Sequence, residues 1–586
     1  MKTDSEAKYD FIIVGAGPAG CSLASHLAAS PAKPSVLLLE AGGDNSDINA
    51  RVGVNRFIQI ANPELTYPYE SVPQYHLGGR ALKLERGRGL GGSSCINFTL
   101  WDVGARDDWE KIAQLTGDNM WNWQNVQKRF RELEDFHGKV PEDVPPNMEK
   151  YVCPKSQNHG SGGLLRTAMS SSWESFTIPV LETWESNGYT INKDASSGDR
   201  LGMSIGSTTC FRGTRSTASD LLLGAPPNLQ VVTNAIAHRV LFEDSRAVGV
   251  VLVDEKVYRA NHEVILSAGT LDTPKILMHS GIGSDSQLSS FGIPLVHQNP
   301  HVGRNYMDHY FSTLRFRQSD GLDSVMPYFR SPVLQAKAMK QWQLYRDGEC
   351  TTTASSALYG FFKSDAVMKS REYADLPTVE QARLRLPTIP TYEIAFSSIG
   401  PECYTAPDTT PPIINVLVVI HNSQGLGHVE LKSKDPTAPL EFHPACLTHP
   451  YDQRVAIEAT REVLKVIKTG NFLQEGASNA SQWDTPATDD EEDILKWWRE
   501  RCGTTWHMSG TCKMAQTEDE GGVVDSDFRV FGVNGLRVVD MSIMPIMLSA
   551  HTQAAAYQVG MIAAEKLIKE YDLLVQESEV NYNSQG

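Results

Sequence analysis

The chain has 586 residues, 41% of them hydrophobic, and a formal net charge of −17. This length exceeds what one hydrophobic core usually serves, so we expect two closely joined domains with a large packed interior. The acidic balance argues against nucleic acid or an anionic membrane as the main partner, and no stretch approaches the ~18 apolar residues of a membrane span.

The N-terminal segment has the pattern of a strand, a helix and a second strand. Residues 9–14 form an apolar run, residues 18–29 are rich in small residues, and residues 35–40 form a second apolar run. Because both runs are mainly apolar, with unbroken apolar stretches at Phe11 to Val14 and Val36 to Leu39, they predict buried strands of a parallel, doubly wound sheet. The first run leads directly into a glycine loop and lacks the shape of a signal peptide. With nine scattered cysteines and no peroxisomal signal at the C-terminus, we expect free thiols and a cytoplasmic location.

A GxGxxG pattern lies between the first strand and the helix, and the second strand ends in an acid. In this context the pattern predicts a dinucleotide site, with the pyrophosphate at the helix N-terminus and the acid on a ribose. The last glycine of the pattern would let the helix pack closely on the strand. The pattern alone does not separate FAD from NAD. The predicted contacts are Gly15, Gly17, Pro18, Ala19, Gly20, Glu40 and Ala41.

Later segments predict a mixed architecture. Residues 66–86 look like a loop, and residues 228–268 alternate in short runs that predict a β-meander returning to the sheet. From residue 311 to about residue 500, helix-like stretches such as 333–345 mix with strand-like ones such as 412–420. We assign this region to a second domain that shapes the substrate pocket. A final helix is expected over residues 553–571.

Three segments carry a family resemblance. Residues 87–97 (GRGLGGSSCIN), residues 269–283 (GTLDTPKILMHSGIG) and residues 302–309 (VGRNYMDH) are similar to the signatures of the glucose-methanol-choline (GMC) oxidoreductases, in the family's order. The resemblance implies FAD and an α/β fold, with a Rossmann-like FAD-binding domain and an inserted α+β substrate-binding domain. We place the FAD-binding domain at residues 7–310 and 498–572, with a lid near 66–86. The substrate-binding domain would cover residues 311–497 plus parts of about 165–205.

The resemblance also extends the expected cofactor site. Some members of the family attach the flavin through a histidine in the first signature, where this chain has Cys95, Ile96 and Asn97, so we expect non-covalent FAD. The N-terminus of the final helix would favour negative charge on the reduced flavin. Asp540, which ends a strand, would contact the ribityl or pyrophosphate groups through its backbone or its side chain. The further predicted contacts are Arg88, Gly91, Gly92, Ser93, Asn97, Phe98, Ala237, Asp540, Thr552 and Gln553.

Two histidines match the family's catalytic positions. His507 lies in a segment similar to the one that carries the base, and His551 matches a second position that is histidine or asparagine in the family. A neutral imidazole can take the hydroxyl proton as hydride leaves the carbon, and a second imidazole can hold the oxygen. His309 lies in a family segment, but we interpret it as structural. The sequence predicts no metal site.

The pocket residues favour an aromatic or otherwise planar alcohol. We expect Phe98, Trp506, His507 and His551 to line the pocket, and the chain is most similar to the aryl-alcohol oxidase branch. With a cytoplasmic location, this suggests a step in natural-product biosynthesis. The electron acceptor is left open between oxygen and a quinone. Two alternatives are a hydroxynitrile-lyase-like enzyme that keeps FAD as a scaffold and a non-catalytic flavoprotein.

Overall fold

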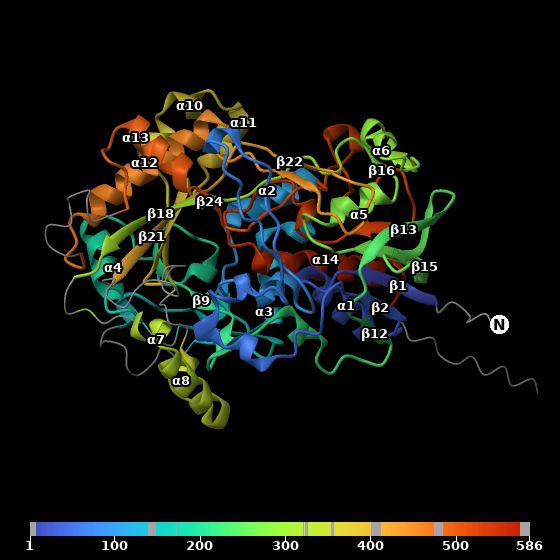
Figure 1. Ribbon diagram of the computed structural model, residues 1–586, viewed down its shortest axis with the longest axis horizontal. Helices are drawn as coiled ribbons and strands as arrows, with labels where there is room; N and C mark the ends of the chain where they lie inside the picture. Colours follow the sequence, from blue (N-terminus) through green and yellow to red (C-terminus); the bar gives the residue numbers. More distant parts are fainter. Residues whose placement is uncertain are drawn as a thin grey trace, which may run out of the picture.

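The computed structural model describes residues 8–138, 148–170, 173–319, 322, 326–352, 357–399, 412–473 and 484–574. Two large sheets lie toward opposite ends of the long axis of the molecule (Figure 1). The C-terminal residues on which the peroxisomal argument rests are outside the described residues. Within the described part of the chain, the helices are either too short or too polar to cross a bilayer.

The first sheet contains the predicted nucleotide-binding unit. Its strand order is β12-β2-β1-β15-β14-β13, and β25 pairs with β15. The core strands β1 and β2 are parallel. All of β2 and the last four residues of β1 are buried, as their apolar stretches predict. Helix α1 packs against β1 and against the final helix α14. The bounds are β1 Lys8–Val14, α1 Pro18–Ala29, β2 Val36–Leu39, β12 Leu229–Val232, β13 Ala237–Glu243, β14 Arg246–Leu252, β15 Val257–Leu266, β25 Leu536–Val538 and α14 Gln553–Glu570.

The β-meander prediction is right for three strands and wrong for the fourth. Strands β13, β14 and β15 are consecutive antiparallel neighbours. Strand β12, in contrast, lies at the opposite edge of the sheet and pairs in parallel with β2. Alternation of apolar residues identifies a strand but contains no information about which neighbour it pairs with.

The second sheet is antiparallel and has the order β24-β18-β21-β20-β19-β8. Helices α12 and α13 pack against β21 and β18, and Figure 1 shows both helices at the end of the molecule away from β1. Strand β8 joins this sheet from the region near residue 200, but the domain boundaries themselves stay a prediction. The bounds are β8 Gly202–Ile205, β18 Tyr310–Arg317, β19 Leu358–Phe362, β20 Tyr392–Ser397, β21 Ile413–Ile420, α12 Pro450–Ile467, α13 Glu491–Arg501 and β24 Gly503–Thr504.

The expected lid near residues 66–86 is a hairpin-like excursion. Strands β3 (Thr66–Tyr67) and β4 (Arg86–Gly87) pair at its base. At its far end the Arg80 guanidinium donates to the carbonyl groups of Arg499 and Cys502, at 2.8 and 3.0 Å. The excursion is therefore fastened to the segment that leads into β24.

The remaining α-helices and strands have the following bounds. The helices are α2 Arg106–Thr116, α3 Trp123–Leu133, α4 Thr177–Ser186, α5 Thr273–His279, α6 Asp285–Ser290, α7 Met326–Arg330, α8 Pro332–Tyr345, α9 Asp365–Met368, α10 Arg371–Ala374 and α11 Thr378–Leu384. The strands are β5 Leu100–Trp101, β6 Glu134–His137, β7 Leu165–Met169, β9 Ser207–Thr208, β10 Cys210–Phe211, β11 Thr214–Arg215, β16 Ile282–Gly283, β17 His297–Gln298, β22 His428–Glu430 and β23 Glu441–His443.

Candidate active site

A cavity of about 1060 Å³ connects the two sheets. It extends from the GxGxxG loop at the carboxyl end of β1 to residues on β18, β20 and β21. This is where open α/β sheets bind their ligands. Most of the predicted cofactor contacts line it: Gly15, Gly17, Pro18, Ala19, Glu40, Ala41, Gly92, Ser93, Asn97, Phe98, Ala237, Asp540, Thr552 and Gln553.

The glycines of the loop have different physical roles. Gly15 has φ +106°, and a Cβ there would lie 2.3 Å from the Ser267 carbonyl oxygen. A Cβ at Gly20 would lie 1.9 Å from the Gly15 carbonyl oxygen, so Gly20 serves the packing of helix on strand and lies outside the cavity lining. A Cβ at Gly17 would meet no protein atom within 4 Å. Since α1 begins at Pro18 with no side-chain cap, its first N–H groups and the open space at Gly17 form a cradle for an anionic group.

Besides Gly20, two predicted contacts lie away from the cavity lining. Arg88 places its guanidinium 5.5 Å from the centre of the Tyr67 ring. Gly91 has φ +96°, and a Cβ there would lie 2.7 Å from the Cys95 sulfur. Arg88 and Gly91 thus support the glycine-rich turn of residues 87–97. Gly92 and Ser93 of the same turn line the cavity instead.

Two carboxylates at the cavity already accept protein hydrogen bonds. Glu40 accepts from the backbone N–H groups of Ala16, Gly42 and Gly89, at 2.9, 2.9 and 3.0 Å. Asp540 accepts from the N–H groups of Gly269 and Ser542 and from the Thr273 hydroxyl, at 2.9, 2.8 and 2.6 Å. Of the two modes expected for Asp540, the side chain is largely committed to the protein, which favours a contact through the backbone.

The residues at the start of α14 favour a flavin where that helix meets the cavity. The side-chain oxygen Oε1 of Gln553 accepts a hydrogen bond from the Asn97 amide, while the side-chain nitrogen Nε2 of Gln553 is buried without a partner. The helix begins there with no side-chain cap at Thr552. An unpaired buried donor and a helix N-terminus both favour an acceptor with negative charge. The residues at both ends of the cavity therefore fit FAD.

The polar contacts of the His507 ring are made by Nδ1. It lies 2.9 Å from the Thr505 hydroxyl oxygen and 3.0 Å from Nδ1 of His309. The Thr505 hydroxyl also lies 3.1 Å from the His309 carbonyl oxygen, and when it donates there it accepts from Nδ1 of His507. Among the described residues no hydrogen bond is made to Nε2 of His507, and the ring lines the cavity. Burial, with the neighbouring His551, holds the pKa of His507 well below its usual range, which keeps the ring neutral.

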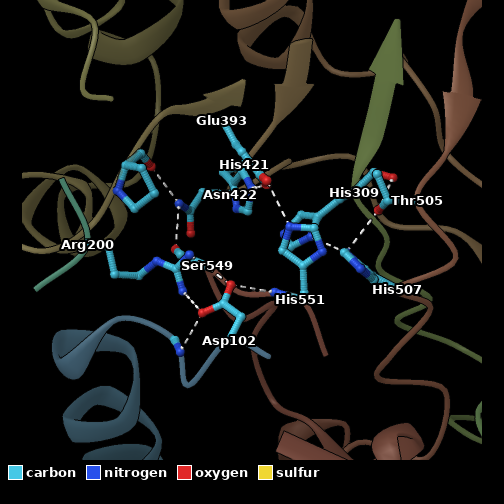
Figure 2. A network of polar contacts seen from close by, with 12 residues as sticks. Asp102, Arg200, His309, Glu393, His421, Asn422, Thr505, His507, Ser549 and His551 are labelled. Atoms are coloured by element: carbon cyan, nitrogen blue, oxygen red, sulfur yellow. Dashed lines mark hydrogen bonds and ion pairs between the residues drawn. The ribbon is translucent and has the colours of Figure 1, made fainter. Parts of the chain in front are cut away.

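His551 is held by a buried carboxylate. Glu393 on β20 bridges two imidazoles, with its oxygens 2.8 Å from Nε2 of His551 and 2.9 Å from Nε2 of His421 (Figure 2). Burial would lower the pKa of His551, but the charge and hydrogen bond of Glu393 outweigh it and raise the pKa. Burial acts in the opposite sense on Glu393, yet the two histidines hold the pKa of that carboxyl well below its usual range. The Glu393 carboxylate is buried and the His551 side chain is about one quarter exposed, and the carboxylate favours the protonated form of that ring.

A second layer fixes the backbone around the two histidines. The N–H of His551 donates to Asp102 at 2.9 Å, and Asp102 pairs with Arg200 (Figure 2). The N–H of His507 donates to Asp308, also at 2.9 Å. The rings of His507 and His551 end with centroids 5.0 Å apart and planes at 73°. The two rings therefore meet edge to face, and both line the cavity.

The sequence analysis gave no role to Glu393 or His421 and did not predict the contact of His309 with His507. Glu393 could have been singled out as the one charged residue in the mainly apolar strand β20. His309, interpreted as structural, is fully buried and contacts Nδ1 of His507 at 3.0 Å, so it helps to hold that ring in place.

Aromatic side chains line the cavity near the two histidines. Phe98 meets Trp506 edge to face at a centroid distance of 5.7 Å, and Phe57 lies 4.9 Å from Phe98. The Trp506 indole donates to Glu85 on the lid at 2.8 Å, which fixes its orientation. The predicted pocket residues Phe98, Trp506, His507 and His551 are all brought to one cavity.

A separate group of potential metal ligands lies on the β22–β23 hairpin. His428, Glu430 and His443 place their ligand atoms within 4.8 Å of one another. Glu430 is already paired with Arg304 at 3.0 Å, and the group lies outside the cavity lining. It therefore has no part in the site described above.

Comparisons with known proteins agree with this geometry. The chain matches GMC oxidoreductase family models over residues 9–311 and 423–560. It is 28% identical to an alcohol dehydrogenase [acceptor] of Pseudomonas putida, over 99% of both chains. A formate oxidase structure from Aspergillus oryzae RIB40 superposes with a TM-score of 0.86 at 25% identity, over 97% of this chain and 100% of that one. A fungal aryl-alcohol oxidase shares the fold at 23% identity, with a TM-score of 0.80 over 96% and 99% of the chains. The chain belongs to the GMC oxidoreductases and is an FAD-dependent oxidoreductase acting on CH–OH donors.

Proposed function

We propose that the protein oxidises a primary or secondary alcohol of planar, apolar character to the aldehyde or ketone, with His507 as the base. The observation that carries this proposal is the arrangement of His507, whose Nδ1 contacts Thr505 and His309 while its ring lines the cavity, which leaves Nε2 to act as the base. Bound FAD supplies the hydride acceptor.

Residues of this chain bind the substrate, accept its proton and stabilise its oxygen. His507 takes the hydroxyl proton on Nε2, and its depressed pKa keeps it able to do so at neutral pH. The imidazolium of His551 donates through Nδ1 to the substrate oxygen as negative charge develops there, since its Nε2 is occupied by Glu393. Phe98 and Trp506 cover the substrate with aromatic surface and exclude water.

Non-covalent binding of FAD is part of the proposal. The Cys95 thiol, the most nucleophilic group of the three candidate attachment positions, donates to the Leu90 carbonyl at 3.2 Å. It lies outside the cavity lining, while Ile96 and Asn97 offer no nucleophile. A cytoplasmic location, a role in natural-product biosynthesis, and oxygen or a quinone as acceptor stay predictions.

Anaerobic mixing of the holoenzyme with benzylic, allylic and sugar alcohols tests the function. We expect benzylic or allylic alcohols to bleach the oxidised flavin, and readmitted air or an added quinone to restore it. A flavin that stays oxidised with every alcohol would contradict redox catalysis. Reduction by sugars alone would contradict the proposed substrate class.

A further inference from the structure

Three strands of the second sheet present a regular grid of side chains to the cavity. Alternate residues of β21, namely Asn415, Leu417 and Val419, line it. Each of these residues has one neighbour on β18 and one on β20, so the side chains form three rows. The first row is Phe311, Val419 and Glu393, and the second is Thr313, Leu417 and Ala395. The third row is Arg315, Asn415 and Ser397, and we call it the distal rung. Four residues along an antiparallel strand span about 13–14 Å, so the distal rung lies that far from the rung of Glu393.

The polar groups of the distal rung differ in how they are satisfied. Arg315 is ion-paired with Asp484 at 3.2 Å. The Ser397 hydroxyl donates to the Ile399 carbonyl at 3.1 Å and accepts from the Ile399 N–H at 3.0 Å. The Asn415 side chain is 2% exposed, and both its amide nitrogen and its carbonyl oxygen are buried without a partner.

A buried carboxamide with neither end satisfied is costly in a folded protein. A leucine of similar size at this position would avoid the cost, as Leu417 does two residues along the same face. The side chain therefore has the character of a ligand contact, since a ligand group would pair both its donor and its acceptor.

We infer that Asn415 binds a neutral group that both donates and accepts hydrogen bonds, such as a carboxamide, at the far end of the alcohol substrate. The inference rests on the proposed function, because it takes the reacting carbon to lie by His507 and His551. A neutral end is inferred because the unsatisfied groups of Asn415 are one donor and one acceptor, and Arg315 already contacts Asp484, which it shares with Arg501. The rung between the two ends, Thr313, Leu417 and Ala395, is mainly apolar. The substrate class is thus an alcohol with an apolar spacer on the order of 10 Å long and a carboxamide-like end.

The test uses benzylic alcohols with a para methylene chain that ends in one of three groups of similar shape. A primary carboxamide offers a donor and an acceptor, a methyl ketone offers only the acceptor, and an isopropyl group offers neither. The chain length is varied, and kcat/KM is measured for the wild-type holoenzyme, for Asn415→Leu and for Ser397→Ala as the matched control from the same rung. Thermal unfolding of each holoenzyme is measured alongside.

In the wild type we expect kcat/KM to be about tenfold higher for the carboxamide than for the isopropyl compound, at the chain length that reaches the distal rung and not at shorter ones. Asn415→Leu should abolish this ratio without lowering the melting temperature, and Ser397→Ala should retain it. Equal ratios in wild type and Asn415→Leu, or a melting temperature that falls by several degrees in Asn415→Leu, would overturn the inference. The same compounds, with unsubstituted benzyl alcohol added, distinguish the failure of this inference from the failure of the proposed function. If none of them reduces the flavin, the proposed function fails, whereas reduction without any tail preference defeats the Asn415 inference alone.

Discussion

Replacement of Glu393 by glutamine tests how the second histidine obtains its charge. Glutamine has nearly the same shape and can still hydrogen bond to one of the two imidazoles, but it carries no charge to stabilise the imidazolium of His551. Burial then dominates and lowers the pKa of His551, so at pH 7 the ring becomes mostly neutral. We expect kcat at pH 7 to fall roughly 100-fold, the usual loss when one preorganised donor to a developing oxyanion is removed.

The pH dependence gives this prediction its specificity. In the wild type, activity is lost as the pH rises through the raised pKa of His551, because the imidazolium then loses its proton. In Glu393→Gln that alkaline limb should move to lower pH, and acidification should restore activity by up to about tenfold per pH unit. The recovery would not be masked by His507, whose pKa lies well below its usual range.

Stopped-flow flavin reduction between about pH 5 and 9, the range over which a histidine titrates, measures both the fall in rate at pH 7 and the shift of the alkaline limb. The control is Glu462→Gln, which alters a half-buried carboxylate that accepts from the hydroxyls of Ser364 and Tyr392 outside the cavity lining. It should leave the pH profile unchanged. An unshifted alkaline limb in Glu393→Gln, or a loss that acid does not reverse, would refute the reasoning.

Three further substitutions test His507, His551 and the open space at Gly17, and one experiment on the wild type tests how the flavin is attached. His507→Ala should slow flavin reduction by at least about 100-fold while the bound-flavin spectrum stays intact, and a rate within about threefold of wild type would exclude His507 as the base. His551→Asn should retain more activity than His551→Ala in the same stopped-flow assay, because the amide can still donate to the substrate oxygen; equal losses would argue against that role. Gly17→Val should yield a protein with wild-type circular dichroism but little flavin absorbance, because the added side chain meets cofactor space and no protein atom, whereas Gly43→Val should stay yellow. Acid precipitation of the wild type should release the flavin into the supernatant, and a yellow pellet would show covalent attachment.

The sequence by itself determined the parts of the molecule that depend on short-range physics. The bounds expected for the first helix are those of α1, and the final helix differs from the expectation at its C-terminal end by one residue. Apolar runs and the glycine turn impose these elements through local periodicity and backbone sterics. The motif order likewise placed His507 and His551 at one cavity.

Only the tertiary structure decided which distant groups act on these histidines. Glu393 reaches His551 across 158 positions of the chain, and His309 contacts Nδ1 of His507 across 198 positions. The placement of Asn415 in line with Ser397 and Arg315 depends on the register of three strands. Register is set by pairing and packing across the whole sheet, and a shift of one residue would turn every one of these side chains to the other face, so no local pattern in the sequence could specify them.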